Sequence, residues 1–544
     1  MYSLMLCLIF LPAAVRASAL CPDARSSSFV NANHIFNAIH SSMRQWGSSI
    51  HHNGMSFFLA SVPRGTLLYH GTLESEPVNG TEYLAFEPEH ARMFADVSPM
   101  PHPPPPPSPM DRPDRYKQEK LQADEHRQKP LSYAASVHRR EESWLMGGQY
   151  EQQQHSKPPE NGWLHTYEAA KDLRLLYVDG MSAGKTVNGT LDSQDRILLS
   201  REPHSSDYDR AYAFCRMARE DWLDRIDGII RMESGFEIIL CSFERDLHLY
   251  HMAPVKPREQ NGHASRGGKF MKFQTLKAVA SRYHGIGGNR VTLNYENFVT
   301  MYDARYGIDL FNRSDVGEDN GNLDRNPNKD ECGSDWKHPR RPRLTNVPDE
   351  QLRLVRQDVR ELIMKHNAHN ENNFDWQAVT DLVVQRYADP LKYLVSSAFS
   401  SADQLREEIF RILEPFAVDL PAAKSSNVTV DIKKCASQFL PPSRHLQESL
   451  AGRTIYSVTS NICSTLGDAL QESGNTGIVE YIEKLINYLS WSEWKDCRGC
   501  AYSEMCSVPM WPWGIADDYE NPKCRSAHNI DGLNELRYWG GWMF

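Results

Sequence analysis

Three short stretches place a polar side chain where the neighbouring residues predict a buried strand. LLYHGT (residues 67–72) ends an apolar run with His70 and Gly71, EYLAFEPEHA carries Tyr83 in a short strand, and GFEIIL carries Glu237. An imidazole beside bare glycine backbone can hold a planar amide, and an aromatic ring can stack on such a group. A carboxylate within an apolar strand is costly unless it is paired or lines a cavity. Together these side chains would suit a ligand-binding or catalytic site.

Each of the three residues also has a structural interpretation. A histidine near the end of a strand can simply be a satisfied polar residue, and a tyrosine in a short strand can belong to the core. Glu237 could lie on the solvated side of an edge strand. These alternatives stay open for each residue taken alone, so the prediction rests on the order of the three stretches.

In that order, the three stretches resemble the ADP-ribosyltransferase fold, in the His-Tyr-Glu branch that includes diphtheria-type toxins and poly(ADP-ribose) polymerases. The resemblance implies that His70 binds a ribose hydroxyl of NAD, that the backbone at Gly71, with Thr72 beside it, binds the nicotinamide amide, and that Tyr83 stacks on the nicotinamide ring. Glu237 would bind the ribose 2′-hydroxyl and stabilise the oxocarbenium-like charge as the glycosidic bond breaks.

One departure concerns the acceptor of ADP-ribose. Arginine-specific members of this family carry a paired Glu-x-Glu, whereas here Gly235 stands two residues before Glu237 and Glu233 stands four before it. Arginine is therefore disfavoured as the acceptor.

The elements that would position these residues predict an α+β fold. Residues 34–47 have helical spacing of apolar residues, and further strands are expected at 173–180 and 226–243 with a helix at 207–222 between them. The proline-rich and then charged segment 99–159 is expected to be a disordered insertion. We therefore expect an ADP-ribosyltransferase-like split β-sheet domain at 28–98 plus 160–255.

The rest of the chain divides into three parts by composition. Residues 256–347 are rich in Gly, Asn, Arg and Asp and are expected to be irregular. Residues 348–416 predict a helical region of three amphipathic helices, and residues 430–544 are rich in cysteine and tryptophan.

The first residues indicate secretion. An apolar run followed by Ala17-Ser18-Ala19 predicts a signal peptide at 1–19. Its removal leaves ten of the 11 cysteines, an even number that suits disulfides. Sequons for glycosylation stand at Asn79, Asn188, Asn312 and Asn427. These features are typical of a secreted eukaryotic protein.

The overall composition excludes other classes. The net charge of −10 leaves no surplus of basic residues to neutralise phosphates, so nucleic acid is not favoured as a partner. After the leader, no apolar stretch is long enough for a membrane helix, so no membrane association is expected once the leader is removed.

Three further sequence patterns suggest other sites or bonds. VDGMSAGKT (178–186) resembles a phosphate loop but has one residue too few between its glycines. CRGCAYSEMC (497–506) allows a zinc site, although disulfides are favoured in an oxidising compartment. A bridge between Cys215 and Cys241 is conceivable, because both lie on elements near Glu237.

We therefore expect a secreted NAD-cleaving ADP-ribosyltransferase or NAD glycohydrolase, with Glu237, His70 and Tyr83 as catalytic residues. NAD would be a substrate, no metal would be needed, and a protein or other macromolecule would be the acceptor in the transfer reaction. The alternative is a catalytically inactive secreted interaction protein on a degenerate version of the same fold.

Overall fold

The structure is a computed structural model, and it describes most of the chain. The described residues are 31–95, 162–199, 206–255, 273–311, 341–366, 374–418, 429–529 and 536–539. The predicted leader at 1–19, the predicted insertion at 99–159, and the sequons Asn312 and Asn427 lie outside the described residues.

A nine-stranded mixed sheet is the centre of the molecule, with strand order β8-β4-β2-β3-β7-β6-β5-β1-β9. All neighbouring strands are antiparallel except β5 and β6, which are parallel. The strands are β1 (Asn53–Val62), β2 (Leu67–Thr72), β3 (Glu82–Ala85), β4 (Gly162–Ala169), β5 (Leu173–Gly180), β6 (Gly228–Met232), β7 (Phe236–Leu240), β8 (Leu247–Val255) and β9 (Thr292–Thr300). A small second sheet pairs β10 (Glu504–Ser507) with β11 (Lys523–Ser526).

Helices cover the sheet and form a second body of structure beside it. The α-helices are α1 (Ala32–Ser41), α2 (Gln45–Ile50), α3 (Pro88–Arg92), α6 (Asp207–Glu220), α7 (Phe243–Asp246), α9 (Asp349–Met364), α10 (Trp376–Leu394), α11 (Ala402–Leu413), α12 (Ile432–Ser437), α13 (Arg444–Glu448), α14 (Leu450–Gln471), α15 (Asn475–Leu489) and α16 (Ala516–Glu520). The short helical turns are η2 (Met93–Ala95), η4 (Ser193–Leu198), η5 (Ala304–Tyr306), η6 (Glu414–Phe416), η7 (Ser492–Lys495) and η8 (Leu536–Trp539).

Apolar composition explains why the middle of the sheet is buried. Every residue of β6 and β7 is buried, as expected for strands that are covered on both faces. The connection from β5 to its parallel neighbour β6 runs through η4 and α6, because parallel strands need a crossover. At the outer end of the sheet, β8 has exposed residues and a bulge opposite β4.

The mixed α+β class is present, with differences in detail. The three helices expected in 348–416 are present as α9, α10 and α11. The single helix expected over 34–47 is wrong: the helix α1 ends before Met43, whose φ of 52° is left-handed, and the chain continues as α2. The region expected to be irregular, 256–347, supplies the edge strand β9, which pairs with β1.

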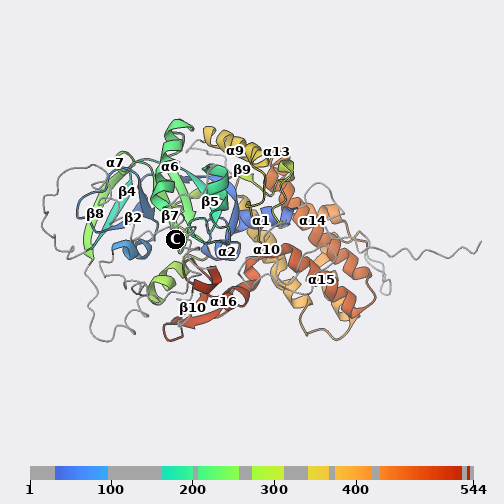
Figure 1. The fold of residues 1–544 in the computed structure, drawn as a ribbon. Helices are drawn as coiled ribbons and strands as arrows, with labels where there is room; N and C mark the ends of the chain where they lie inside the picture. The colour runs from blue at the N-terminus through green and yellow to red at the C-terminus, as the bar shows by residue number, and fades with distance from the viewer. Residues whose placement is uncertain are drawn as a thin grey trace, which may run out of the picture.

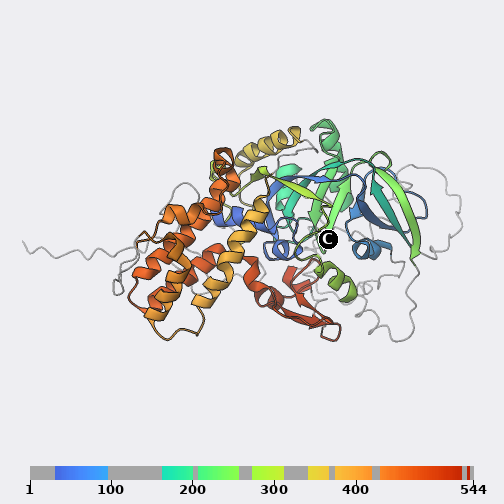
Figure 2. The same cartoon turned by 180° about the vertical axis from the view of Figure 1, so that it is seen from behind.

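The sheet and the helical part share one core. Figures 1 and 2 show α10, α14 and α15 gathered at one end of the molecule and β8 at the other. Buried residues from β1, β5, α9, α10 and α14 belong to one continuous apolar cluster. The long helices α14 and α15 arise in a region whose sequence predicted only cysteine and tryptophan content. In the described part of the chain, no helix is long and apolar enough to cross a bilayer.

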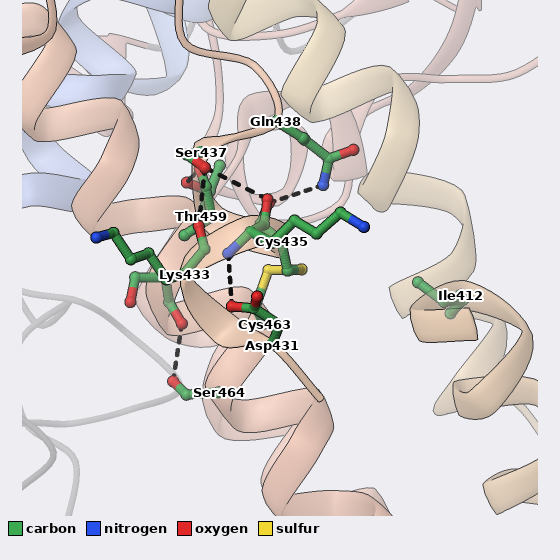
Figure 3. The surroundings of a disulfide bond; sticks show 12 residues. Ile412, Asp431, Lys433, Cys435, Ser437, Gln438, Thr459, Cys463 and Ser464 are labelled. Atoms are coloured by element: carbon green, nitrogen blue, oxygen red, sulfur yellow. Dashed lines mark hydrogen bonds between the residues drawn. A yellow bond between two sulfur atoms is a disulfide. The ribbon is translucent and has the colours of Figure 1, made fainter. Parts of the chain in front are cut away.

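Disulfides are formed throughout the described chain. Cys215 on α6 is bonded to Cys241 after β7, which confirms the bridge that was only conceivable from the sequence. The other bridges are Cys435–Cys463, Cys497–Cys506 and Cys500–Cys524. Figure 3 shows the bridge that ties the short α12 to α14. The cysteines of CRGCAYSEMC are therefore bonded in pairs, and the prediction of disulfides there is confirmed.

Candidate functional site

His70 is a buried residue whose ring is already hydrogen-bonded. Its Nδ1 lies 2.7 Å from the backbone oxygen of Tyr83. The ring packs edge-on against Phe243, with the centroids 5.7 Å apart, and lies near His165. Burial lowers the pKa of His70 to about 4, with a smaller opposing contribution from the hydrogen bond to Tyr83. The imidazole is therefore neutral near pH 7.

Gly71 owes its identity to close packing. A Cβ at this position would overlap the carbonyl oxygen of Ala91 in α3. The Cα of Gly71 is therefore covered by α3, and is not open to a ligand from that side. Thr72, at the end of β2, is half-buried and accepts a hydrogen bond from the N–H of Glu74 at 3.2 Å.

Tyr83 and Glu237 lie on neighbouring strands and share a face of the sheet. Ala85 of β3 is the direct antiparallel partner of Glu237 in β7, and Tyr83 stands two residues before Ala85. Direct partners and residues two apart point to the same face. Tyr69 of β2 also pairs with Ala85, so the next residue, His70, points to the opposite face. The structure thus brings Tyr83 and Glu237 together and leaves the His70 ring on the other side.

Arg231 contacts both Tyr83 and Glu237. It is the direct partner of Glu237 in the β6–β7 hairpin, and its Nε donates to Glu237 Oε1 at 2.6 Å. The guanidinium carbon lies 5.5 Å from the centroid of the Tyr83 ring. Arg231 is fully buried and also donates to Asp207 Oδ2 at 3.1 Å and to Gln194 Oε1 at 3.3 Å. All of the charge on Arg231 is satisfied within the protein.

Asp207, the first residue of α6, is the hub of the surrounding ion network. Lys185 Nζ lies 2.6 Å from Asp207 Oδ2, and Arg210 Nη1 lies 3.6 Å from Oδ1. Arg210 also donates through Nε to Asp195 at 2.9 Å. The start of a helix favours a carboxylate, because the helix dipole is positive there. The hydroxyl of Tyr83 donates to the backbone oxygen of Asp207 at 2.9 Å, which ties β3 to α6.

Glu233 and His90 extend this network toward α3. Lys185 Nζ donates to Glu233 Oε2 at 2.9 Å, and its charge lies 4.7 Å from the ring centroid of Trp511. His90 Nε2 lies 3.8 Å from Glu233 Oε1. A Cβ at Gly235 would lie 2.8 Å from His90 Nδ1, so glycine lets the β6–β7 turn approach α3.

Burial and charge act in opposite directions on the carboxylates. Burial is the largest effect on Glu237 and raises its pKa; the attraction of Arg231 opposes this shift, and the neighbouring Glu233 adds to it. Burial would also raise the pKa of Asp207, but Arg231, Lys185 and Arg210 outweigh it and hold that pKa well below its usual range. Asp207 is therefore the permanent negative charge that the cations of this network share.

Sequence reasoning missed seven charged or titratable members of this network: His90, Lys185, Asp195, Asp207, Arg210, Arg231 and Glu233. Two signals were present in the sequence. Lys185 belongs to VDGMSAGKT, which was set aside as a phosphate loop, and Arg231 interrupts the apolar strand GIIRM. Because a buried arginine needs a buried carboxylate, Arg231 implied an acidic partner, which the sequence alone could not identify.

Neither of the clefts described in the structure lies at this network. The larger one has a volume of about 540 Å³ and lies between η4, α6 and α9, where Leu198, Met217 and Arg356 are among its lining residues. A second, of about 380 Å³, lies between α10 and η7. The predicted site residues border neither cleft.

Comparison with known proteins gives relatives in yeast. Residues 24–261 match the family model described as the YPL277C N-terminal domain. The chain is 25% identical over 584 aligned residues to the Saccharomyces cerevisiae protein named "Uncharacterized protein YOR389W", covering 91% of this chain and 84% of the relative. It is 27% identical over 455 residues to "Uncharacterized protein YPL277C" of the same yeast, covering 71% of this chain and 79% of the relative.

No solved structure matches this chain. The family match spans β1 to β8 and contains every residue of the ion network around Asp207. In that segment the chain is similar to the YPL277C N-terminal domain.

Proposed function

We propose that this chain is a secreted interaction protein on a degenerate ADP-ribosyltransferase-like fold, and that it does not cleave NAD. The observation that carries the proposal is the contact of Arg231 with both the Tyr83 ring and the Glu237 carboxylate. The resemblance assigned those two residues to a planar, positively charged nicotinamide ring and to the cation that forms when it leaves. The planar cation of Arg231 takes up both interactions.

The energetics favour a closed site. A ligand that took the place of Arg231 would leave the carboxylates of Asp207 and Glu237 without their main partner. Breaking a buried ion pair costs about 3–5 kcal/mol. A loss of that size would weaken a micromolar ligand, whose binding is worth about 8 kcal/mol, to the millimolar range.

The other residues predicted to bind NAD are not gathered around Glu237. The Nδ1 of His70 is bonded to Tyr83, and the ring lies on the face of the sheet opposite Glu237. The Cα of Gly71 is covered by α3. Recognition of a macromolecular partner by the outer surface is the function that we propose in place of NAD cleavage. The four disulfides of the described chain are compatible with secretion.

The experiment measures nicotinamide release from NAD by the purified, oxidised full chain, together with the thermal shift on adding NAD. We expect no release above the rate without protein and no shift. Glu237→Gln serves as the matched variant, because it keeps the shape of the side chain. Release by the wild-type chain that disappears in Glu237→Gln would contradict the proposal.

A second candidate is the NAD-cleaving enzyme itself. It is favoured by the order of the strands: β2, β3 and β7, which carry His70, Tyr83 and Glu237, are consecutive neighbours in the sheet. Arg231 would then have to swing away from Glu237 before NAD could bind. Under this alternative, Arg231→Gln should increase nicotinamide release, whereas under the first proposal it should leave release at the background rate.

A further inference from the structure

His90, Glu233 and Glu237 meet at one point beneath α3. His90 lies on α3, Glu233 directly follows β6, and Glu237 is the second residue of β7. One nitrogen or oxygen atom of each side chain lies within 4.8 Å of the corresponding atoms of the other two. The three residues are 2%, 4% and 2% exposed, so water cannot freely solvate them. Polar groups held this tightly in the interior need partners.

The imidazole of His90 is one of these groups. Among the described residues, its Nε2 is a buried atom with no hydrogen bond. It points toward Glu233, whose Oε1 is 3.8 Å away, beyond hydrogen-bond distance. The hydroxyl of Ser234, in the same turn, is also buried and without a hydrogen bond in the described structure. Two buried polar atoms without hydrogen bonds, one on each side of the contact between α3 and the β6–β7 turn, point to a missing occupant.

The two carboxylates are held in place by cations on their outer sides. Lys185 donates to Oε2 of Glu233, and Arg231 donates to Oε1 of Glu237. Each contact uses one oxygen and leaves the second oxygen of each carboxylate for another partner. Groups that bond to the far side of a ligand and fix its orientation are typical of metal sites. Gly235 contributes as well, since a side chain there would push the turn away from His90.

We propose that His90, Glu233 and Glu237 bind a divalent transition-metal ion, with Zn²⁺ as the leading candidate. One imidazole and two carboxylates form a nitrogen and oxygen donor set that suits zinc. In a tetrahedral site, ligand atoms about 2.0–2.2 Å from the zinc ion lie roughly 3.3–3.6 Å apart. The 3.8 Å between His90 Nε2 and Glu233 Oε1 is slightly longer, and a small side-chain rotation would bring both atoms onto one ion.

The ion would relieve a specific electrostatic problem. Glu233 and Glu237 are two carboxylates buried close together, and a divalent charge between them offsets their repulsion. It would also tie α3 to the β6–β7 hairpin across the close contact at Gly235. The inference does not depend on whether the chain cleaves NAD, because the proposed role of the ion is structural.

The test starts from the full oxidised chain, produced without a histidine tag and purified without chelator. Keeping the disulfides intact excludes the cysteines of the C-terminal region as competing ligands. After dialysis against Zn²⁺ and removal of free metal, elemental mass spectrometry should detect about one zinc ion bound per chain. Replacement by Co²⁺ should give visible absorption of the intensity typical of four-coordinate cobalt.

His90→Gln removes the nitrogen donor and should lower the bound metal at least tenfold. His445→Gln on α13 is the matched control, because His445 is exposed and far from the site, and it should retain wild-type binding. If His90→Gln does not fold, the Co²⁺ spectrum of the wild-type chain decides the question alone. A wild-type chain with no stoichiometric metal and no Co²⁺ spectrum would overturn the proposal and leave His90 and Glu233 as an ion pair. Full metal binding by folded His90→Gln would overturn it too.

Discussion

Replacing Arg231 by methionine should be one of the most damaging single changes to the stability of this protein. Methionine replaces the apolar stem of arginine, but it is shorter and carries no charge. The change removes the donor that bonds Glu237 at 2.6 Å, Asp207 at 3.1 Å and Gln194 at 3.3 Å. Arg231 is fully buried, so water cannot replace these bonds. We expect a loss of about 3–5 kcal/mol in the free energy of unfolding, the usual cost of leaving buried charges unpaired.

In the chain without bound metal, Glu237→Gln should cost much less, although it breaks the same ion pair. Glutamine keeps an oxygen that accepts from Arg231, and Arg231 keeps Asp207 as its counter-ion. Burial already raises the pKa of Glu237, so a neutral group in its place relieves part of that cost. We expect a loss of about 1 kcal/mol, the net value of an ordinary hydrogen bond. The double variant Arg231→Met with Glu237→Gln should be more stable than Arg231→Met by about 1–3 kcal/mol.

Guanidinium unfolding followed by tryptophan fluorescence measures these differences as shifts of the midpoint at constant slope. Arg411→Met is the matched control. Arg411 forms ion pairs with Glu407 and Glu408 at the surface, where they are screened by solvent, and we expect no measurable change. An Arg231→Met protein as stable as the wild type would refute the reasoning. A Glu237→Gln protein as unstable as Arg231→Met would also refute it, because the loss of stability would then come from breaking the Arg231–Glu237 ion pair and not from leaving buried carboxylates unpaired.

Three other predictions follow from single contacts. Burial lowers the pKa of His70 from 6.5 to about 4, so between these pH values the unfolded chain binds a proton at His70 that the folded chain does not. The free energy of unfolding therefore decreases as the pH falls from about 6.5 to 4, and His70→Gln should flatten that part of a pH–stability profile. Gly71→Ala should destabilise the protein by about 1–3 kcal/mol, because the added methyl group overpacks against α3. Gly80→Ala is the control: it has open space around it and should cost only the strain of a φ of 79°. Equal unfolding midpoints for the two variants would argue against a packing role for Gly71. Removing the Cys215–Cys241 bridge by a double alanine change should cost about 2–4 kcal/mol, and an unchanged melting temperature would contradict this.

The local features of the fold follow directly from the sequence. The spacing of apolar residues predicts α9, α10 and α11. The turn at Ser234 and Gly235 between two apolar runs predicts the β6–β7 hairpin. These features depend on neighbours within a few residues, which sequence periodicity reports well.

Pairing between strands that are far apart in the chain could not be predicted from local sequence patterns. β9 comes from a region with the composition of a loop, and it becomes a strand because β1 offers an edge. The break after α1 at Met43 likewise has no sequence signal. In both cases tertiary contact overrides local preference.

For the candidate site, the sequence by itself indicated His70, Tyr83 and Glu237 as candidate binding residues and predicted that Tyr83 and Glu237 lie on strands. It could not determine which face of the sheet each side chain occupies, because one residue of register exchanges the two faces. Only the tertiary structure decided that His70 points away from Glu237, that α3 covers Gly71, and that Arg231 meets Glu237. Those outcomes depend on strand pairing between segments far apart in the chain, and on the need of each buried charge for a partner.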